Sequence, residues 1–217
     1  MRTSTKGLIE IAAHEGLVTA PYKDSVGVWT IGVGHTEGAG LPNPAKMQKG
    51  SQRPPSEMLD LFRRDIKKYE AGVNRVLGRK AVRQHEYDAM VSFHYNTGAI
   101  GRAAWVKKLL AGDKAGAVVS IMAWKKPPEI IGRRKKEQKL LNKAVYTANG
   151  YTNVYPASRT GKVLWSRGKK MNLLQSFPEA APTPVPPIPV GPPHTPHKPE
   201  QQISFWSWLI SFFKGRS

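Results

Sequence analysis

Residues 14–36 read HEGLVTAPYKDSVGVWTIGVGHT, and the pattern of apolar residues changes period inside this stretch. Apolar residues in 8–13 recur at nearly helical spacing, and Gly16 is the kind of residue that stops a helix one position past its end. After Gly16, β-forming residues alternate with glycines, and Asp24 opens a polar turn. The stretch therefore predicts a helix that ends at Glu15 and a small twisted hairpin beside it.

Two carboxyl groups flank this change of period. Glu15 would lie at a helix C-terminus, where the macrodipole disfavours a negative charge and so favours the protonated form that a general acid needs. Asp24 would stay ionised in a polar turn, and Thr30 would present a hydroxyl from a neighbouring strand. Two carboxyl groups in contrasting environments are typical of a glycosidase. The residues alone leave open a plainer interpretation, a solvated acidic pair beside a structural hairpin.

The threonine stands six positions after the aspartate, which itself follows the glutamate by nine. Together with the surrounding Tyr-Lys-Asp and Trp-Thr-Ile-Gly-Val-Gly-His, this spacing resembles the catalytic signature of the phage-type lysozymes, the endolysins of glycoside hydrolase family 24. The likeness extends over residues 6–148. It includes a core helix at 84–98 and a Gly-Arg-Arg-x-x-Glu pattern at 132–137.

The resemblance implies an α+β fold, mostly helical and lysozyme-like, with a small N-terminal β-hairpin lobe. It also implies a muramidase that hydrolyses the β-1,4 bond between N-acetylmuramic acid and N-acetylglucosamine in peptidoglycan. The reaction would be an inverting single displacement without metal or cofactor. The catalytic residues would be Glu15 as general acid, Asp24 as the group that orients water, and Thr30 as a second contact to that water.

Three further residues are expected to support the site. His35 matches a family position that looks structural, and we expect it to make a buried hydrogen bond. An arginine near the cleft, Arg133 or Arg134, could pair with Glu15 or hold a sugar carboxylate or acetamido oxygen.

Two other functions remain open at this stage. A lytic transglycosylase would use the muramyl 6-hydroxyl in place of water, but it needs no water-positioning Asp24 and Thr30. In a non-catalytic cationic module that disrupts walls or membranes, no chemistry would require these three catalytic residues to occur together.

The composition narrows the choice of partners. The 217 residues include 34 Lys and Arg against 15 Asp and Glu, a net charge of +19, and they include no Cys. Such a charge predicts attraction to polyanions. Zinc-finger spacing, an RNA-binding aromatic box and leucine-zipper heptads are absent from the sequence, so we expect anionic wall and membrane components rather than nucleic acid.

Apolar spacing predicts further helices in the lysozyme-like part. One begins after Ser56, a residue that commonly caps helices, and carries apolar residues every three or four positions up to Val76. A second covers 84–98 and ends at Gly98. A third starts near Ile131 and continues through Val145.

Four segments are predicted along the chain: a catalytic domain at 1–148, a basic extension of unassigned structure at 149–177, a disordered Pro-rich linker at 178–200, and a tail at 201–217. Proline at this density favours an extended polyproline II spacer. The tail would form a short amphipathic helix of about 18 Å, too short to span a bilayer. Such a helix is suited to the interface of an anionic membrane or to outer-membrane lipid. Docking of the tail on the catalytic domain, or oligomerisation, is the alternative. The membrane-contacting residues would be Phe205, Trp206, Trp208, Leu209, Phe212 and Phe213.

The N-terminal residues lack the continuous apolar core of a secretory signal, because Glu10 interrupts it. We therefore expect the protein to stay in the host cytoplasm until a partner such as a holin releases it to the periplasm and cell wall.

Overall fold

The computed structural model describes residues 1–177. The predicted linker at 178–200 and tail at 201–217 lie outside the described residues. The described chain contains helices α1 (Thr5–Glu15), α2 (Pro55–Leu77), α3 (Gln84–Thr97), α4 (Ala104–Leu110), α5 (Lys114–Ser120) and α6 (Ile131–Lys143). Its strands are β1 (Leu17–Lys23), β2 (Trp29–Gly32), β3 (His35–Thr36), β4 (Tyr151–Tyr155) and β5 (Lys169–Asn172). Short 3-10 helices occur at Glu37–Ala39, Pro44–Lys46, Ile121–Ala123, Pro128–Ile130 and Trp165–Arg167.

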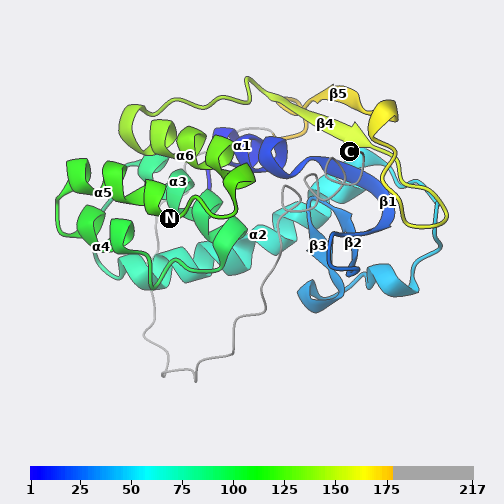
Figure 1. Ribbon diagram of the computed structural model, residues 1–217, viewed down its shortest axis with the longest axis horizontal. Coiled ribbons are helices and arrows are strands. Elements are labelled where there is room, and N and C mark those ends of the chain that lie inside the picture. The colour runs from blue at the N-terminus through cyan, green and yellow to red at the C-terminus, as the bar shows by residue number, and fades with distance from the viewer. Residues whose placement is uncertain (178–217) are drawn as a thin grey trace.

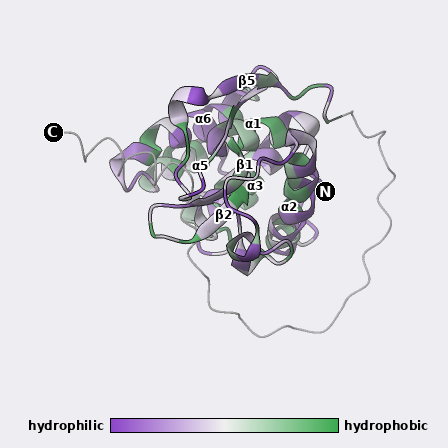
Figure 2. Cartoon of the chain, turned by 90° about the vertical axis from the view of Figure 1, so that its right-hand side faces the viewer, coloured by the Kyte–Doolittle hydropathy of each residue, from purple (hydrophilic) through white to green (hydrophobic). Residues whose placement is uncertain are grey.

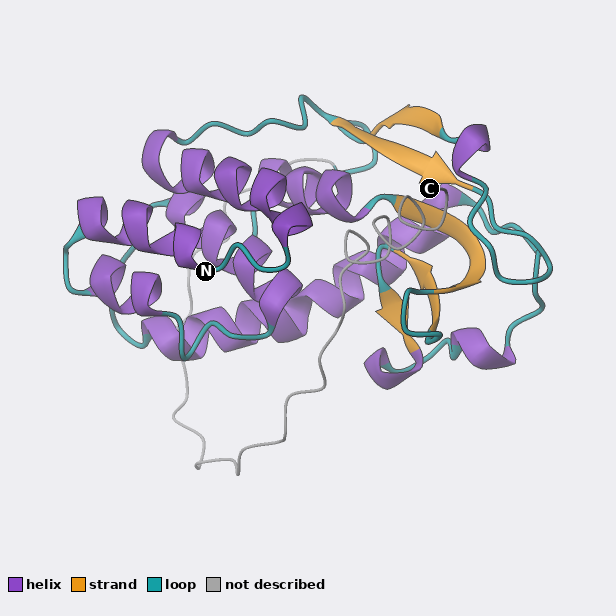
Figure 3. Ribbon diagram, in the orientation of Figure 1, coloured by secondary structure: helices purple, strands orange, loops and turns teal. Residues whose placement is uncertain are grey.

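Most helices gather on one side of the molecule and the strands on the other, and α2 runs from the helical side toward the sheet (Figures 1 and 3). The sheet has the order β3-β2-β1-β4-β5. β1 pairs antiparallel with β2 and parallel with β4. This mostly helical α+β architecture with a small sheet confirms the predicted fold class.

The change of period at Gly16 is seen directly in the backbone. α1 ends at Glu15, and Gly16 follows with φ of +71°, a backbone conformation that residues other than glycine rarely adopt. Gly98 ends α3 in the left-handed conformation as expected. The local signals therefore predicted both helix ends correctly.

Two predicted helix boundaries are wrong by a few residues. α2 begins at Pro55 with Pro54 at the N-cap, and the cap makes no side-chain hydrogen bond. Proline favours the first helical position because its φ is already helical, so Ser56 falls inside the first turn instead of capping it. α6 stops at Lys143, because Ala144 adopts φ of +56° and ends the helix before Val145.

The main core lies between the helices and the inner face of the sheet. α2 contributes Leu59, Phe62, Ile66 and Val73, all nearly inaccessible, while most of its charged residues are exposed. Figure 2 accordingly shows both hydrophobic and hydrophilic stretches along α2. Trp105 of α4 is fully buried and packs edge-on against Phe93 of α3 at 5.2 Å between ring centroids. The burial of these aromatic rings stabilises the helical lobe.

Residues 149–177, whose structure the sequence left unassigned, extend the sheet. β4 pairs with β1, and β5 pairs with β4 at the edge. A second, smaller core forms on this side of β1. It contains Val18, Ala20, Tyr22, Ala157 and Val163.

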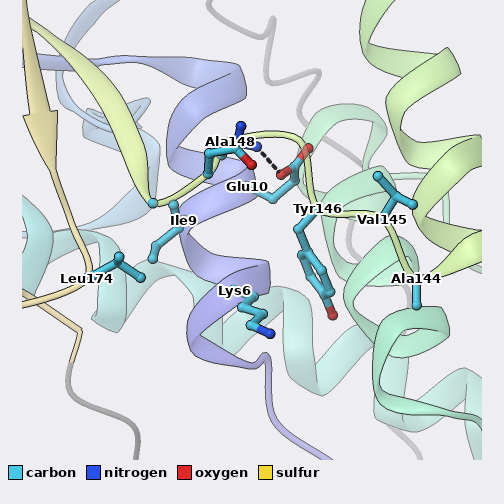
Figure 4. Close-up of a pocket in the computed structure, with 10 residues that line it drawn as sticks. Lys6, Ile9, Glu10, Ala144, Val145, Tyr146, Ala148 and Leu174 are labelled. Atoms are coloured by element: carbon cyan, nitrogen blue, oxygen red, sulfur yellow. Dashed lines mark hydrogen bonds between the residues drawn. The ribbon is translucent and has the colours of Figure 1, made fainter.

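Glu10 of α1 is hydrogen-bonded to the segment that connects α6 with β4. Its carboxylate accepts hydrogen bonds from the backbone N–H groups of Thr147 at 2.7 Å and Ala148 at 2.9 Å. Figure 4 shows Glu10 pointing toward Ala148. The residue that interrupts the apolar N-terminal run is therefore buried and hydrogen-bonded rather than solvated.

Candidate active site

Glu15, the last residue of α1, lies where the helical lobe meets the sheet, since β1 begins two residues later. Its side chain is 2% exposed. The guanidinium of Arg133, from α6, donates a hydrogen bond to Glu15 Oε1 and forms a buried ion pair with it. Of the two candidate arginines, Arg133 is therefore the one that pairs with Glu15. The position of Glu15 at a helix end did not by itself predict a positive charge beside it.

Arg133 is held on three sides. Besides Glu15, it donates through Nε to Glu137 Oε1 at 3.0 Å and through Nη2 to the Ser92 carbonyl oxygen at 3.1 Å. Burial lowers the pKa of Arg133, but the charges of Glu15 and Glu137 outweigh burial, and its pKa lies above the ordinary value. Arg133 therefore remains a fixed cation beside Glu15.

Arg134 belongs to the same buried cluster but makes different contacts. It pairs with Glu137 and donates to Asn96 Oδ1 at 2.7 Å and to the Trp124 carbonyl oxygen at 3.0 Å. Its guanidinium also lies 4.8 Å from the centre of the Phe93 ring. These contacts tie α6 to α3 and the 3-10 helix at Ile121–Ala123, so the structure gives Arg134 a packing role.

Asp24 occupies the predicted turn between β1 and β2. Its Oδ1 accepts hydrogen bonds from the backbone N–H groups of Val26 at 3.0 Å and Val28 at 2.8 Å. Two such bonds fix the direction of the carboxylate within the turn. The side chain is half-buried, and Val26 at the tip of the turn is 58% exposed.

Thr30 lies on β2, opposite Tyr22 of β1 in the antiparallel register. Its side chain is 3% exposed, and its hydroxyl donates to the Val28 carbonyl oxygen at 3.2 Å. The same Val28 therefore contacts Asp24 through its N–H group and Thr30 through its carbonyl.

Tyr22 connects the two carboxyl groups electrostatically, a feature that the sequence did not reveal. Burial raises the pKa of its phenol strongly, and the charges of Glu15 and then Asp24 raise it further. Tyr22 also lies opposite Thr30 in the β1–β2 register and two residues before Asp24 along the chain. Tyr69 of α2 and Tyr95 of α3 also have a pKa raised by burial, with Glu15 a further contributor in both cases. The only sequence signal was Tyr22's place in the Tyr-Lys-Asp motif.

His35 makes the buried hydrogen bonds expected of it. Nδ1 lies 2.8 Å from Asp65 Oδ2 in α2, and Nε2 lies 2.9 Å from the Pro42 carbonyl oxygen. Because both ring nitrogens have partners, His35 joins β3 to α2 and the following loop, and it is not placed for proton transfer.

His14, directly before Glu15, is another buried residue that the sequence did not single out. Burial lowers its pKa well below the ordinary value, and the charges of Arg133, Lys136 and Arg134 lower it further. His14 is therefore neutral, so it does not add a second charge to the Arg133 side of the site.

A pocket of about 400 Å³ lies away from the three predicted catalytic residues, and Glu10 is one of the residues that line it (Figure 4). Its lining comes from α1, the segment after α6, and the end of the described chain, and it includes none of the three predicted catalytic residues.

Within residues 1–177, no group of three or more His, Asp or Glu side chains is placed to hold a metal ion. None of the helices in this part of the chain is both long and apolar enough to cross a bilayer. The six tail residues from Phe205 to Phe213 lie outside it.

A helical lobe, a small sheet and a buried glutamate at their junction define a lysozyme-type glycoside hydrolase. The phage lysozyme family model matches residues 12–142, and the chain belongs to this family of peptidoglycan-lytic enzymes.

Individual relatives agree with this assignment. The endolysin of Acyrthosiphon pisum secondary endosymbiont phage 1 is 30% identical over 155 residues, which is 66% of this chain and 100% of that protein. The endolysin of Salmonella phage P22 is 27% identical over 64% of this chain and 97% of its own length. Among solved structures, the endolysin from Escherichia coli O157:H7 phage FAHEc1 superposes with a TM-score of 0.61 at 30% identity, covering 68% of this chain and 97% of that one. This chain therefore carries residues beyond the complete lysozyme unit of these relatives.

Proposed function

We propose that this protein is a muramidase that hydrolyses the β-1,4 bond between N-acetylmuramic acid and N-acetylglucosamine. Water would attack in an inverting single displacement. The observation that carries the proposal is the pair of carboxyl groups in different surroundings, Glu15 buried at a helix end and Asp24 in a polar turn whose Val28 also bonds Thr30. One such group can hold a proton while the other stays ionised.

In this mechanism Glu15 donates a proton to the glycosidic oxygen as the bond breaks. Asp24 accepts a hydrogen bond from the attacking water, takes the proton that this water loses as its oxygen bonds to the sugar carbon, and balances the positive charge that develops on the sugar ring. Exchange with solvent then returns a proton to Glu15 and removes one from Asp24. The Thr30 hydroxyl, which can both donate and accept, holds the same water. No covalent sugar intermediate forms, because the second carboxylate activates water instead of attacking carbon.

Arg133 keeps the acid in place. Its three hydrogen bonds join α1, α3 and α6 at one point, so the direction of the Glu15 carboxyl is set by the packing of three helices. A group held in this way loses little freedom when substrate binds. Arg133 therefore acts as a positioning residue, and Arg134 and His35 support the lobes on either side.

The proposal is tested by digesting purified peptidoglycan with Glu15→Gln and Asp24→Asn variants. Each change should remove most activity and leave the circular dichroism spectrum unchanged, since both groups work in the transition state. Glu57→Gln and Asp60→Asn are matched controls, because these carboxylates are 45% and 70% exposed on α2. Full activity in both active-site variants would contradict the proposal.

Product analysis separates hydrolysis from transglycosylation. Hydrolysis leaves reducing ends, with the α-anomer formed first if the reaction inverts, whereas a transglycosylase leaves anhydro-muramic ends. A catalytically idle cationic module would release no soluble fragments at all.

We also propose that residues 201–217 bind an anionic bacterial membrane, with the Pro-rich segment as a spacer. This proposal rests on the sequence, in which aromatic and apolar residues alternate with Ser204, Ser207 and Ser211 and end at Lys214. In a flotation assay with anionic vesicles, a truncation after Pro199 should lose binding and keep activity on purified wall. Equal flotation of both proteins would refute a membrane role.

Release from the cytoplasm through a holin-type membrane lesion completes the proposed function. Expression of the protein without such a partner should leave cells intact. Lysis that a Sec inhibitor blocks would show instead that the protein is exported by the secretory route.

A further inference from the structure

The loop at residues 157–163 is a compact, self-supported structure just after β4. Ala157 and Val163 form an isolated antiparallel bridge. Ser158 N–H donates to the Lys162 carbonyl oxygen at 2.8 Å, and the Ser158 hydroxyl accepts from Lys162 N–H at 3.1 Å. The loop lies outside residues 12–142, the range that matches the phage lysozyme family. Its role therefore has to be sought in this chain's own contacts.

The loop continues the pairing of β1 toward the proposed active site. β4 pairs with β1 at Leu17 and Val18, so the register between these two strands ends before the second half of β1. There the carbonyl oxygen of Gly161 accepts a hydrogen bond from the Lys23 N–H group at 2.9 Å. Lys23 directly precedes Asp24.

Gly161 also packs against the strand on the far side of the Asp24 turn. A Cβ atom built on Gly161 would lie 2.8 Å from two ring atoms of Trp29, and its φ of +79° suits glycine alone. Trp29 is the residue before Thr30. Gly161 thus contacts both strands between which the turn is held.

Two further attachments fix the loop to the lobe. Ala157 and Val163 are buried in the small core with Tyr22. The Gln52 side chain donates to the Ala157 carbonyl oxygen at 2.9 Å and accepts from the Thr19 hydroxyl at 2.6 Å. The loop is therefore bound to β1 through side chains as well as backbone.

The Asp24 turn is held from within by its own hydrogen bonds, and outside it the Lys49 ammonium lies 4.2 Å from the centre of the Trp29 ring. Inside the turn, Asp24 N–H donates to the Val28 carbonyl oxygen at 3.0 Å, and the carboxylate accepts its two bonds from Val26 and Val28. All of these bonds are internal, so they fix the shape of the turn but not its position. Position depends on the two strands, and Gly161 contacts both.

We propose that the 157–163 loop is a positioning element for Asp24: it holds the backbone at Lys23 and Trp29, and so sets where the Asp24 carboxylate directs the attacking water. This inference rests on the proposed catalytic role of Asp24. A displacement of about 1 Å in a catalytic group can cost on the order of a hundredfold in rate.

The test compares two alanine substitutions within the same extension. Gly161→Ala places a Cβ against Trp29, whereas Gly150→Ala places one 2.8 Å from Leu174, far along the chain from Asp24. Both glycines have φ near +80°, at +79° and +85°, so the backbone strain is matched. Initial rates are measured on soluble peptidoglycan fragments, with melting temperatures taken in parallel.

Gly161→Ala should lower kcat by about tenfold with little change in KM, while Gly150→Ala lowers the melting temperature similarly and keeps kcat. In an Asp24→Asn background, Gly161→Ala should cause no further loss of the residual rate, because the group that it positions is already disabled. Equal losses of kcat in the two glycine variants, or full additivity with Asp24→Asn, would overturn the inference.

Gln52→Ala provides a second perturbation if Gly161→Ala does not fold. It removes the side-chain bond to the Ala157 carbonyl oxygen without backbone strain, and it should lower kcat in the same direction by a smaller factor. An unchanged kcat in a folded Gln52→Ala protein would count against the loop. If Asp24→Asn alone keeps full activity, the proposed function of Asp24 fails, and this outcome is distinct from a failure of the loop.

Discussion

Replacing Arg133 by Met removes the cation that joins Glu15 and Glu137 in the buried cluster. Methionine keeps an unbranched chain of similar reach and makes no hydrogen bonds, so the loss is mainly electrostatic. Glu137 keeps Arg134 and the Ser92 hydroxyl, which donates to it at 2.8 Å. Glu15 loses its guanidinium partner while staying in a site that is 2% exposed.

The size of the effect follows from this burial. Removing one partner of a buried ion pair costs about 3–5 kcal/mol, because the remaining charge stays away from water. For a domain of this size each kcal/mol lowers the melting temperature by roughly 2–4 °C, so Arg133→Met should melt about 6–20 °C lower. Glu15→Gln in the same background should recover much of the loss, since a neutral amide needs no cation.

Urea unfolding of the four proteins in this cycle measures the coupling between Glu15 and Arg133. We expect a coupling energy above about 1.5 kcal/mol. A loss below about 1 kcal/mol, or additive single and double variants, would refute the argument that this ion pair supports the fold.

Three smaller predictions concern the stability of the folded protein. Burial lowers the pKa of His94 to about 4 from 6.5, so the unfolded chain binds more protons than the folded one between these values. His94 should lower stability by about 1–2 kcal/mol as the pH drops from 6.5 to 4, and His94→Gln should remove this part of the slope and leave the part due to His14, as urea midpoints would show. Ala144→Gly should raise stability by about 0.5–1 kcal/mol in thermal melts, since the residue ends α6 at positive φ. Asp65→Ala should lower it by about 1–3 kcal/mol by removing the Nδ1 partner of His35, and an unchanged melting temperature would contradict this.

Features specified by neighbouring residues were predictable from the sequence. The helix stop at Gly16, the turn at Asp24 and the end of α3 at Gly98 each depend on one residue type and its immediate surroundings. The error at Ser56 is also local. A serine and a proline both favour a helix start, and Pro55 at the first helical position displaced the expected cap by two residues.

Features made by distant residues were not predictable in the same way. Glu15 and Arg133 are 118 positions apart, and two adjacent arginines offered equal chemistry until packing of α6 turned one toward α1 and the other toward α3. The 149–177 segment has β-forming residues, but its parallel pairing with β1 has no local signature. The pairing of β4 depends on a free edge of β1, which exists only once the rest of the sheet has folded.

The Glu15–Arg133 pair also bears on the proposed acid step. Arg133 presents a positive charge to Glu15 within a buried site. Because Glu137 and Ser92 hold Arg133 in place, its charge acts on Glu15 both before and after proton transfer. As the proton leaves, this fixed charge stabilises the carboxylate that forms on Glu15. The packing of α6 against α1 therefore takes part in the proposed acid step as well as in the fold.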